Sequence, residues 1–151
     1  MQARFPMALA AVVVTGSWAV AAEQKIEMKD LPPAVQQAVQ QQSKGATVRG
    51  LTKEVEHGKT EYEAELTVNG HGKDVSFDPL GKVIGVEEEV PIASIPEAAR
   101  KAIQKAAGDG KVNKVEQVTE GGKTFYEASL RKGSKNSEIQ VDSTGKRVKE
   151  D

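Results

Sequence analysis

The chain contains the same segment twice. Residues 95–151 align with residues 31–87 without a gap, at a constant offset of 64 positions. The recurring residues include Pro32/Pro96, Ala34/Ala98, Gly58/Gly122, Lys59/Lys123, Thr60/Thr124, Tyr62/Tyr126, Glu63/Glu127, Ala64/Ala128, Leu66/Leu130, Asp78/Asp142, Gly81/Gly145 and Lys82/Lys146. Stacked solenoid repeats typically have periods of roughly 20 to 50 residues. The longer period therefore predicts two small folded units in tandem.

Each copy begins with a predicted amphipathic helix. Apolar residues recur at helical spacing in both copies, so one stripe of each helix faces a core. The stripes comprise Leu31, Val35 and Val39 in the first copy, and Ile95, Ala99 and Ile103 in the second. Pro32 and Pro96 stand at the start, where a helix tolerates a missing N–H donor.

After each helix the apolar period changes from 3.6 to 2 residues, which indicates strands. Within residues 61–68, the apolar side chains fall on one face, and the other face carries Glu61, Glu63 and Glu65. Glycine-containing turns separate this run from its neighbours. The predicted fold class is α+β, a tandem repeat in which each unit is one helix packed on a four-stranded antiparallel meander. Repeat 1 is expected at 23–90 and repeat 2 at 91–151.

Residues 1–22 have the pattern of a signal peptide. Arg4 precedes a short apolar run, and Ala19, Ala21 and Ala22 supply small residues for cleavage. The run is shorter than the about 20 apolar residues that span a bilayer, so no stable membrane insertion is expected after its removal. The chain has no cysteine, which excludes a lipoprotein anchor and a disulfide. The expected destination is outside the cytoplasm, either periplasmic or secreted.

The two copies carry opposite net charge. Residues 23–90 contain 8 Lys/Arg and 13 Asp/Glu, a net −5, whereas residues 91–151 contain 12 and 9, a net +3. This difference is either ordinary solvated surface or a field that steers docking between the copies or between chains. The small net charge of the whole predicts no nucleic-acid partner.

Three motifs occur in the same order in both copies. They are Leu-Pro-x-Ala or Ile-Pro-x-Ala at the helix start, Gly-Lys-Thr-x-Tyr-Glu-Ala-x-Leu at 58–66 (Phe in the variable position at 122–130), and Asp-x-x-Gly-Lys at 78–82 and 142–146. This ordered set, over residues 31–151, resembles the PepSY-like domain family, exported bacterial domains described as similar to beta-lactamase inhibitor proteins. The resemblance implies a helix packed on an antiparallel sheet and a binding or inhibitory role. It implies no catalytic residues, because a shared fold does not fix a shared chemistry.

The residues themselves offer little material for catalysis. Without cysteine, and with two histidines, His57 and His71, in predicted turns at opposite ends of one strand, no nucleophile and base are expected to meet. A calcium site between the glutamates of 61–65 and those of 87–89 is conceivable, but glutamates on one strand face are usually solvated. The sequence therefore predicts no enzyme, no cofactor and no metal site.

Tyr62 and Tyr126 are interpreted as core residues, because they follow the inward alternation. Phe125 takes the outward position that Glu61 has in the first copy, and Arg131 follows it on the same strand. The predicted function is an exported, non-enzymatic binding module, inhibitory toward a protease or another envelope enzyme. The alternative is a periplasmic cation or small-ligand sensor that uses the carboxylate-rich face. The partner-binding residues expected for an unidentified protein are Glu61, Glu63, Glu65, Phe125 and Arg131.

Overall fold

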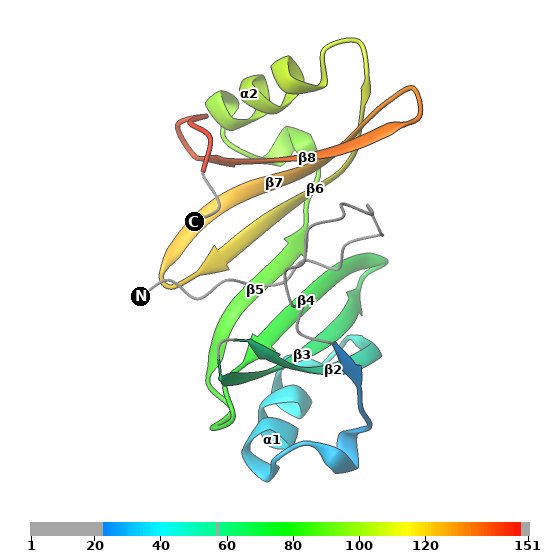
Figure 1. Ribbon diagram of the computed structural model, residues 1–151, viewed down its shortest axis with the longest axis vertical. Helices are drawn as coiled ribbons and strands as arrows, with labels where there is room; N and C mark the ends of the chain where they lie inside the picture. Colours follow the sequence, from blue (N-terminus) through cyan, green and yellow to red (C-terminus); the bar gives the residue numbers. More distant parts are fainter. Residues whose placement is uncertain (1–22, 57, 149–151) are drawn as a thin grey trace.

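A computed structural model describes residues 23–56 and 58–148 of the chain. It contains one antiparallel sheet of eight strands, which lie side by side in chain order, and two α-helices (Figure 1). The strands are β1 (Gln24–Lys25), β2 (Thr47–Glu56), β3 (Lys59–Val68), β4 (His71–Phe77), β5 (Val83–Glu89), β6 (Lys111–Glu120), β7 (Lys123–Lys132) and β8 (Lys135–Asp142). The helices are α1 (Pro33–Gln42) and α2 (Glu97–Ala107), and short 3-10 turns η1 (Met28–Asp30) and η2 (Ile92–Ser94) precede them.

Both helices begin next to the prolines that the sequence places there. Pro32 and Pro96 are the N-cap residues, and their carbonyl oxygens accept the first helical hydrogen bonds, from Gln36 N at 2.9 Å and Arg100 N at 3.0 Å. Proline fits this position because its missing N–H would have no intrahelical partner. No helix in the described part of the chain is long and apolar enough to cross a membrane.

Each helix packs its predicted apolar stripe onto the sheet. Val35 and Val39 of α1 are fully buried against β3 and β4, in a core that includes Leu66 and Phe77. The second core gathers α2 with β6, β7 and β8 and comprises Ile95, Ala99, Ile103, Ala107, Val115, Tyr126, Ala128, Leu130, Ile139 and Val141. Tyr62 and Tyr126 are 8% and 7% exposed, which confirms that they are core residues.

The expected architecture of two separate helix-plus-four-strand units is wrong. β5 pairs with β6 from Gly85 opposite Glu120 to Glu89 opposite Glu116, so the two halves form a single eight-stranded sheet carrying two helices. In separate units, β5 and β6 would both be edge strands with unpaired backbone N–H and C=O groups. Pairing them satisfies those groups and removes two exposed edges.

The strand count of the second half also differs from the expectation. Residues 146–148 form no fourth strand, and contribute one isolated bridge between Val141 and Arg147 and a 3.0 Å hydrogen bond from Val148 N to Gln140 O. At the opposite edge, β1 pairs with β2, and no sequence pattern predicted this short strand. The predicted signal peptide, His57 and residues 149–151 lie outside the described residues.

The repeated Asp-x-x-Gly-Lys motif has a structural role in each half. Asp78 Oδ1 accepts hydrogen bonds from the backbone N–H of Leu80 (2.9 Å) and Lys82 (3.0 Å), which closes the turn between β4 and β5. Gly81 has φ +79°, and a Cβ there would lie 2.5 Å from the carbonyl oxygen of Ala34 in α1. Gly145 in the second half approaches Ala98 of α2 in the same way, at 2.6 Å. The motif therefore presses each turn against the start of its helix.

Candidate functional site

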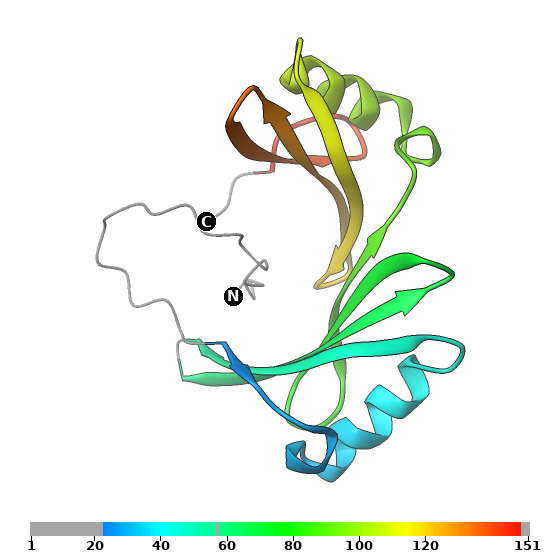
Figure 2. The same cartoon turned by 90° about the vertical axis from the view of Figure 1, so that its right-hand side faces the viewer.

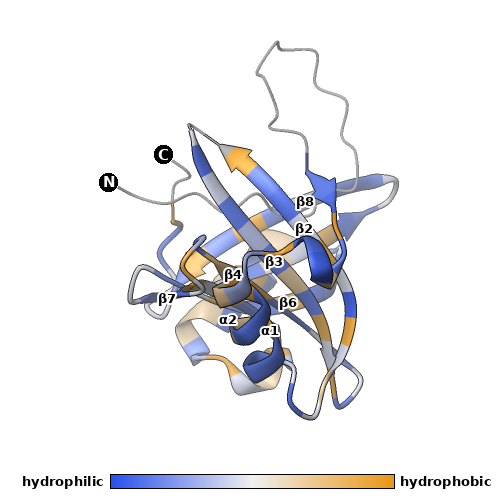
Figure 3. Ribbon diagram, turned by 90° about the horizontal axis from the view of Figure 1, so that it is seen from below, coloured by the Kyte–Doolittle hydropathy of each residue, from blue (hydrophilic) through white to orange (hydrophobic). Residues whose placement is uncertain are grey.

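Both helices cover the same face of the sheet. Figure 2 shows the sheet bending around an open side, with α1 and α2 on the outside of the bend. We call the opposite face, which no described helix covers, the helix-free face. Hydropathy alternates along the strands, as Figure 3 shows, because successive side chains point to opposite faces.

The glutamates of β3 lie on the helix-free face, as their alternation with buried Tyr62 and Leu66 requires. Phe125 and Arg131 of β7 lie on the same face, on the side opposite buried Tyr126. The face therefore carries all five residues expected to bind a partner, which are Glu61, Glu63, Glu65, Phe125 and Arg131. Their role in binding stays a prediction.

The five residues share a face without forming one spot. Glu65 and Phe125 are on strands four positions apart, which corresponds to about 19 Å at a strand spacing of about 4.8 Å. Arg131 is six residues beyond Phe125 on the same strand, about 20 Å further along it. Arg131 is exposed, and its Nε donates a 3.2 Å hydrogen bond to Gly133 O in the following turn. Phe125 and Arg131 are not neighbours.

A denser group of carboxylates lies at the junction of the two halves. Oxygen atoms of Asp74 (β4), Glu87 (β5) and Glu116 (β6) all lie within 4.8 Å of one another. Glu63 on β3 lies opposite Ser76, which is two residues from Asp74 along β4. Glu127 on β7 lies opposite Glu116. We call these five residues the acidic cluster. It exists because β5 and β6 are paired, so each half supplies part of it.

Within the described residues, Arg49 and Lys114 form ion pairs with members of the acidic cluster. Arg49 Nη2 lies 3.4 Å from Asp74 Oδ1, and its Nη1 lies 4.0 Å from Glu65 Oε2. Lys114 Nζ lies 2.8 Å from Glu116 Oε1. Two positive charges against five cluster carboxyl groups leave an excess of negative charge at the junction when all five are ionised.

The cluster is also poorly solvated, although no described helix covers it. Glu116 and Glu127 are 8% and 4% exposed, and two hydroxyl residues on the same face, Thr52 and Ser76, are equally buried. Buried carboxylates favour the protonated form, because a charge loses its hydration in such a place.

Burial and mutual repulsion raise the pKa values of Glu63, Asp74, Glu87 and Glu127. Burial raises the pKa of Glu63 to about 8, and the charges of Asp74 and Glu87 add to the effect. Burial likewise raises the pKa of Asp74 to about 6, although Arg49 opposes the shift. The pKa of Glu87 rises to about 7, through burial and the charge of Glu116. The carboxyl groups therefore share protons near neutral pH and titrate as a coupled set.

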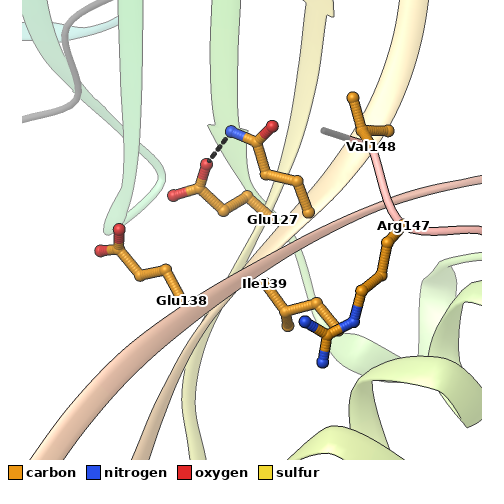
Figure 4. Close-up of a pocket in the computed structure, with 6 residues that line it drawn as sticks. Glu127, Glu138, Ile139, Arg147 and Val148 are labelled. Atoms are coloured by element: carbon orange, nitrogen blue, oxygen red, sulfur yellow. Dashed lines mark hydrogen bonds between the residues drawn. The ribbon is translucent and has the colours of Figure 1, made fainter. Parts of the chain in front are cut away.

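The pKa of Glu127 also rises to about 7, first through burial, while a hydrogen bond from Gln140 opposes the shift. Gln140 Nε2 donates this bond to Glu127 Oε2 at 2.7 Å. Glu127 and Gln140 both line a pocket of about 190 Å³ beside β8, and Figure 4 shows Glu127 among the lining side chains. The pocket is lined by Glu127, Glu138, Ile139, Gln140, Arg147 and Val148. These side chains offer hydrogen bonds and charge.

Sequence reasoning brought Glu63 and Glu87 together as cation ligands that it then set aside, but it missed Asp74, Glu116 and Glu127. The period-2 pattern places Glu87 on an outward face, and pairing the two sheet edges would have brought Glu116 beside it. A β-bulge between Val112 and Lys114 hides the pattern in β6, since it breaks the alternation. The same bulge occurs in β2 between Val48 and Gly50, and Arg49 is the bulged residue.

Solved structures with a similar fold come from Bacteroides species. A protein described as "putative periplasmic" from Bacteroides eggerthii aligns with a TM-score of 0.65 and 19% identity, over 79% of this chain and 86% of its own. A BLIP-like protein from Bacteroides fragilis aligns with a TM-score of 0.58 and 21% identity, over 80% and 85%. A DUF2874 family protein from Bacteroides uniformis aligns with a TM-score of 0.63 and 19% identity, over 78% and 86%. At such identities these likenesses concern the fold alone.

No curated protein matches the chain. A family model described as "Putative beta-lactamase-inhibitor-like, PepSY-like" matches it twice, over residues 14–85 and 60–149. The two matches together span most of the sequence, and they include both copies of the motifs at 58–66 and 122–130. This chain therefore belongs to the PepSY-like family.

Proposed function

We propose that this protein is an exported, non-enzymatic binding module that presents its helix-free face to a protein partner. The observation that carries the proposal is the acidic cluster, in which Glu116 and Glu127 are buried on a face that no described helix covers. Buried like charges lower stability, and perturbed carboxyl groups concentrate at functional sites. A cluster of carboxylates that lowers the stability of the fold is expected where the surface serves binding, because function commonly costs stability.

Two further observations support the proposal. The pattern of residues 1–22 predicts export, and a protein of similar fold is described as periplasmic, which agrees with an envelope destination. Membership of a family described as beta-lactamase-inhibitor-like favours a partner that is itself an envelope enzyme, such as a protease, with inhibition as the result.

Affinity capture from an envelope extract tests the proposal. We expect the wild-type chain to retain a partner that a Phe125→Ala, Arg131→Ala double variant loses, because both side chains lie on the helix-free face. Glu88→Gln is the matched control, since Glu88 lies on β5 but points to the helix side, opposite Lys73. Equal capture by the wild type and the double variant would contradict the assignment of this surface.

The alternative function, a cation sensor, is favoured by the 4.8 Å grouping of Asp74, Glu87 and Glu116. Calcium prefers oxygen ligands and takes six to eight of them, so three carboxylates would form part of a site. Protons compete with a cation for these groups, and calcium binding would therefore be tighter at pH 8 than at pH 6. Calorimetric titration with calcium chloride at pH 6 and pH 8 measures the calcium affinity. The absence of binding heat at both pH values would remove this alternative.

A further inference from the structure

The helix-free face carries more acidic than basic side chains near its centre. By strand register, the charged groups on it are Lys25 of β1, Arg49 and Glu54 of β2, Lys59, Glu61, Glu63 and Glu65 of β3, Asp74 of β4, Glu87 and Glu89 of β5, Lys111, Lys114, Glu116 and Glu120 of β6, Lys123, Glu127 and Arg131 of β7, and Glu138 and Asp142 of β8. Lys59, Lys111, Lys123 and Arg131 lie at strand ends. The centre, across β3 to β7, is acidic, and a partner of opposite charge would complement it.

An aromatic side chain lies beside the acidic centre. Phe125 stands opposite Val118 on β6 and Asp142 on β8, and it is two residues from Glu127 along β7. An aromatic ring attracts a cation to its face, and the methylene stem of lysine or arginine packs on apolar surface. A bare metal ion gains nothing from the half-buried Phe125 ring, whereas a basic side chain can use both the ring and the carboxylates.

We infer that the partner of the helix-free face is a protein segment rich in lysine or arginine, which crosses the acidic cluster and packs its aliphatic stems beside Phe125. The inference rests on the proposed function, and it adds the chemistry of the partner. Arg49 and Lys114 do not balance the negative charge of the cluster when all of its carboxyl groups are ionised. Such a segment supplies the additional positive charge. The span from β3 to β7 is about 19 Å, which about six residues of extended chain would cover.

Binding of such a segment is linked to proton release. Burial raises the pKa of Glu87 to about 7 and that of Glu63 to about 8, so these groups hold protons in the free protein near neutral pH. A cation beside them favours the ionised form and lowers both pKa values. Protons therefore leave as the segment docks, which a hydrophobic or acidic partner would not cause.

The test uses the full chain, expressed with its own residues 1–22, and a fluorescent oligolysine peptide of about ten residues, long enough to cross the face. Anisotropy gives the affinity at low and at physiological ionic strength. Calorimetry in two buffers of different ionisation enthalpy gives the number of protons released at pH 7. The same peptide with acetylated lysines is the ligand control, because acetylation removes the charge and keeps the length.

A Glu87→Gln, Glu116→Gln variant is expected to bind oligolysine at least about tenfold more weakly, with less proton release. Glu88→Gln removes one negative charge on the helix side of β5 and is expected to bind as the wild type does. The acetylated peptide is expected not to bind. Absence of oligolysine binding, equal affinity of the acetylated peptide, or equal loss in Glu88→Gln would each overturn the inference.

The inference can fail while the proposed function stands. If the captured envelope partner is lost by the Phe125→Ala, Arg131→Ala variant but retained by Glu87→Gln, Glu116→Gln, the face binds a protein that is not recognised by its positive charge. Tight binding of calcium chloride or spermine without oligolysine binding would also overturn the inference, in favour of a small-cation site. Loss of the partner and of oligolysine together in the glutamine variant supports it.

Discussion

Gly81→Ala is expected to lower the free energy of unfolding by about 3 to 5 kcal/mol. Gly81 has φ +79°, where a side chain strains the backbone. A Cβ there would also lie 2.5 Å from the carbonyl oxygen of Ala34, which belongs to the backbone of α1 and cannot rotate away. The helix or the β4–β5 turn would have to move, and the first core would loosen. Urea denaturation measures the loss.

Gly70→Ala is the matched control. Gly70 also has a positive φ, +85°, but no atom lies within 4 Å of the Cβ that alanine would add. Its substitution should therefore cost only the conformational strain, about 1 to 2 kcal/mol. Equal losses in the two variants would show that the contact between the Asp-x-x-Gly-Lys turn and α1 contributes nothing.

The stability of the protein is expected to fall by at least about 2 kcal/mol between pH 5 and pH 8. The ordinary pKa of glutamate is 4.5, and in the folded protein those of Glu63 and Glu87 are about 8 and about 7. Between these values the folded state binds more protons than the unfolded state, so stability decreases as the pH rises. Above about pH 9, one unit beyond the pKa of Glu63, both states are ionised and the decrease ends.

Urea denaturation at pH 5, 6.5 and 8 measures the fall. Asp142 does not contribute to the change in stability over this pH range. The hydrogen bond from the Thr144 hydroxyl, and to a lesser extent its other hydrogen bonds, lower the pKa of Asp142, so it titrates in more acidic solution. Glu87→Gln should reduce the pH dependence, and Glu88→Gln should leave it unchanged, since Glu88 points to the other face. Stability that rises from pH 5 to pH 8 would contradict the pKa shifts of the cluster.

Local features of the fold could be predicted from the sequence. The helical stripe identified Val35 and Ile103 as core residues, and the alternation in β3 placed Tyr62 inside and its glutamates outside. These patterns are local, because each reflects one element facing one core. The pairing of β5 with β6 is different, because it depends on the edges of two already formed halves. No periodicity within either half encodes it, and for this reason the two-unit architecture was wrong.

The candidate site was predictable only in part, for the same reason. Glu61, Glu63 and Glu65 share one strand and follow from its period. Asp74, Glu87 and Glu116 lie on three strands from two halves, so their proximity depends on two strand registers. A register slip of one residue would place any of them on the opposite face. Phe125 and Arg131 share a face, as expected, but the length of β7 separates them.

The acidic cluster connects stability with function in this account. Its carboxylates are held where burial and repulsion oppose ionisation, and a single glutamine at Glu87 would relieve part of that cost. Substitutions that raise stability and weaken function are typical of binding surfaces. If the cluster had no function, replacing its carboxylates with uncharged side chains would leave the binding affinity unchanged.

The most direct test is to measure the stability and the partner binding of Glu87→Gln, Glu116→Gln at pH 8, beside Glu88→Gln and the wild type. The account predicts opposite signs: the double variant unfolds at higher urea concentration than the wild type and binds its partner at least about tenfold more weakly. Unchanged binding in the stabilised variant would contradict a binding role for the acidic cluster, and lower stability would contradict the repulsion on which that role rests.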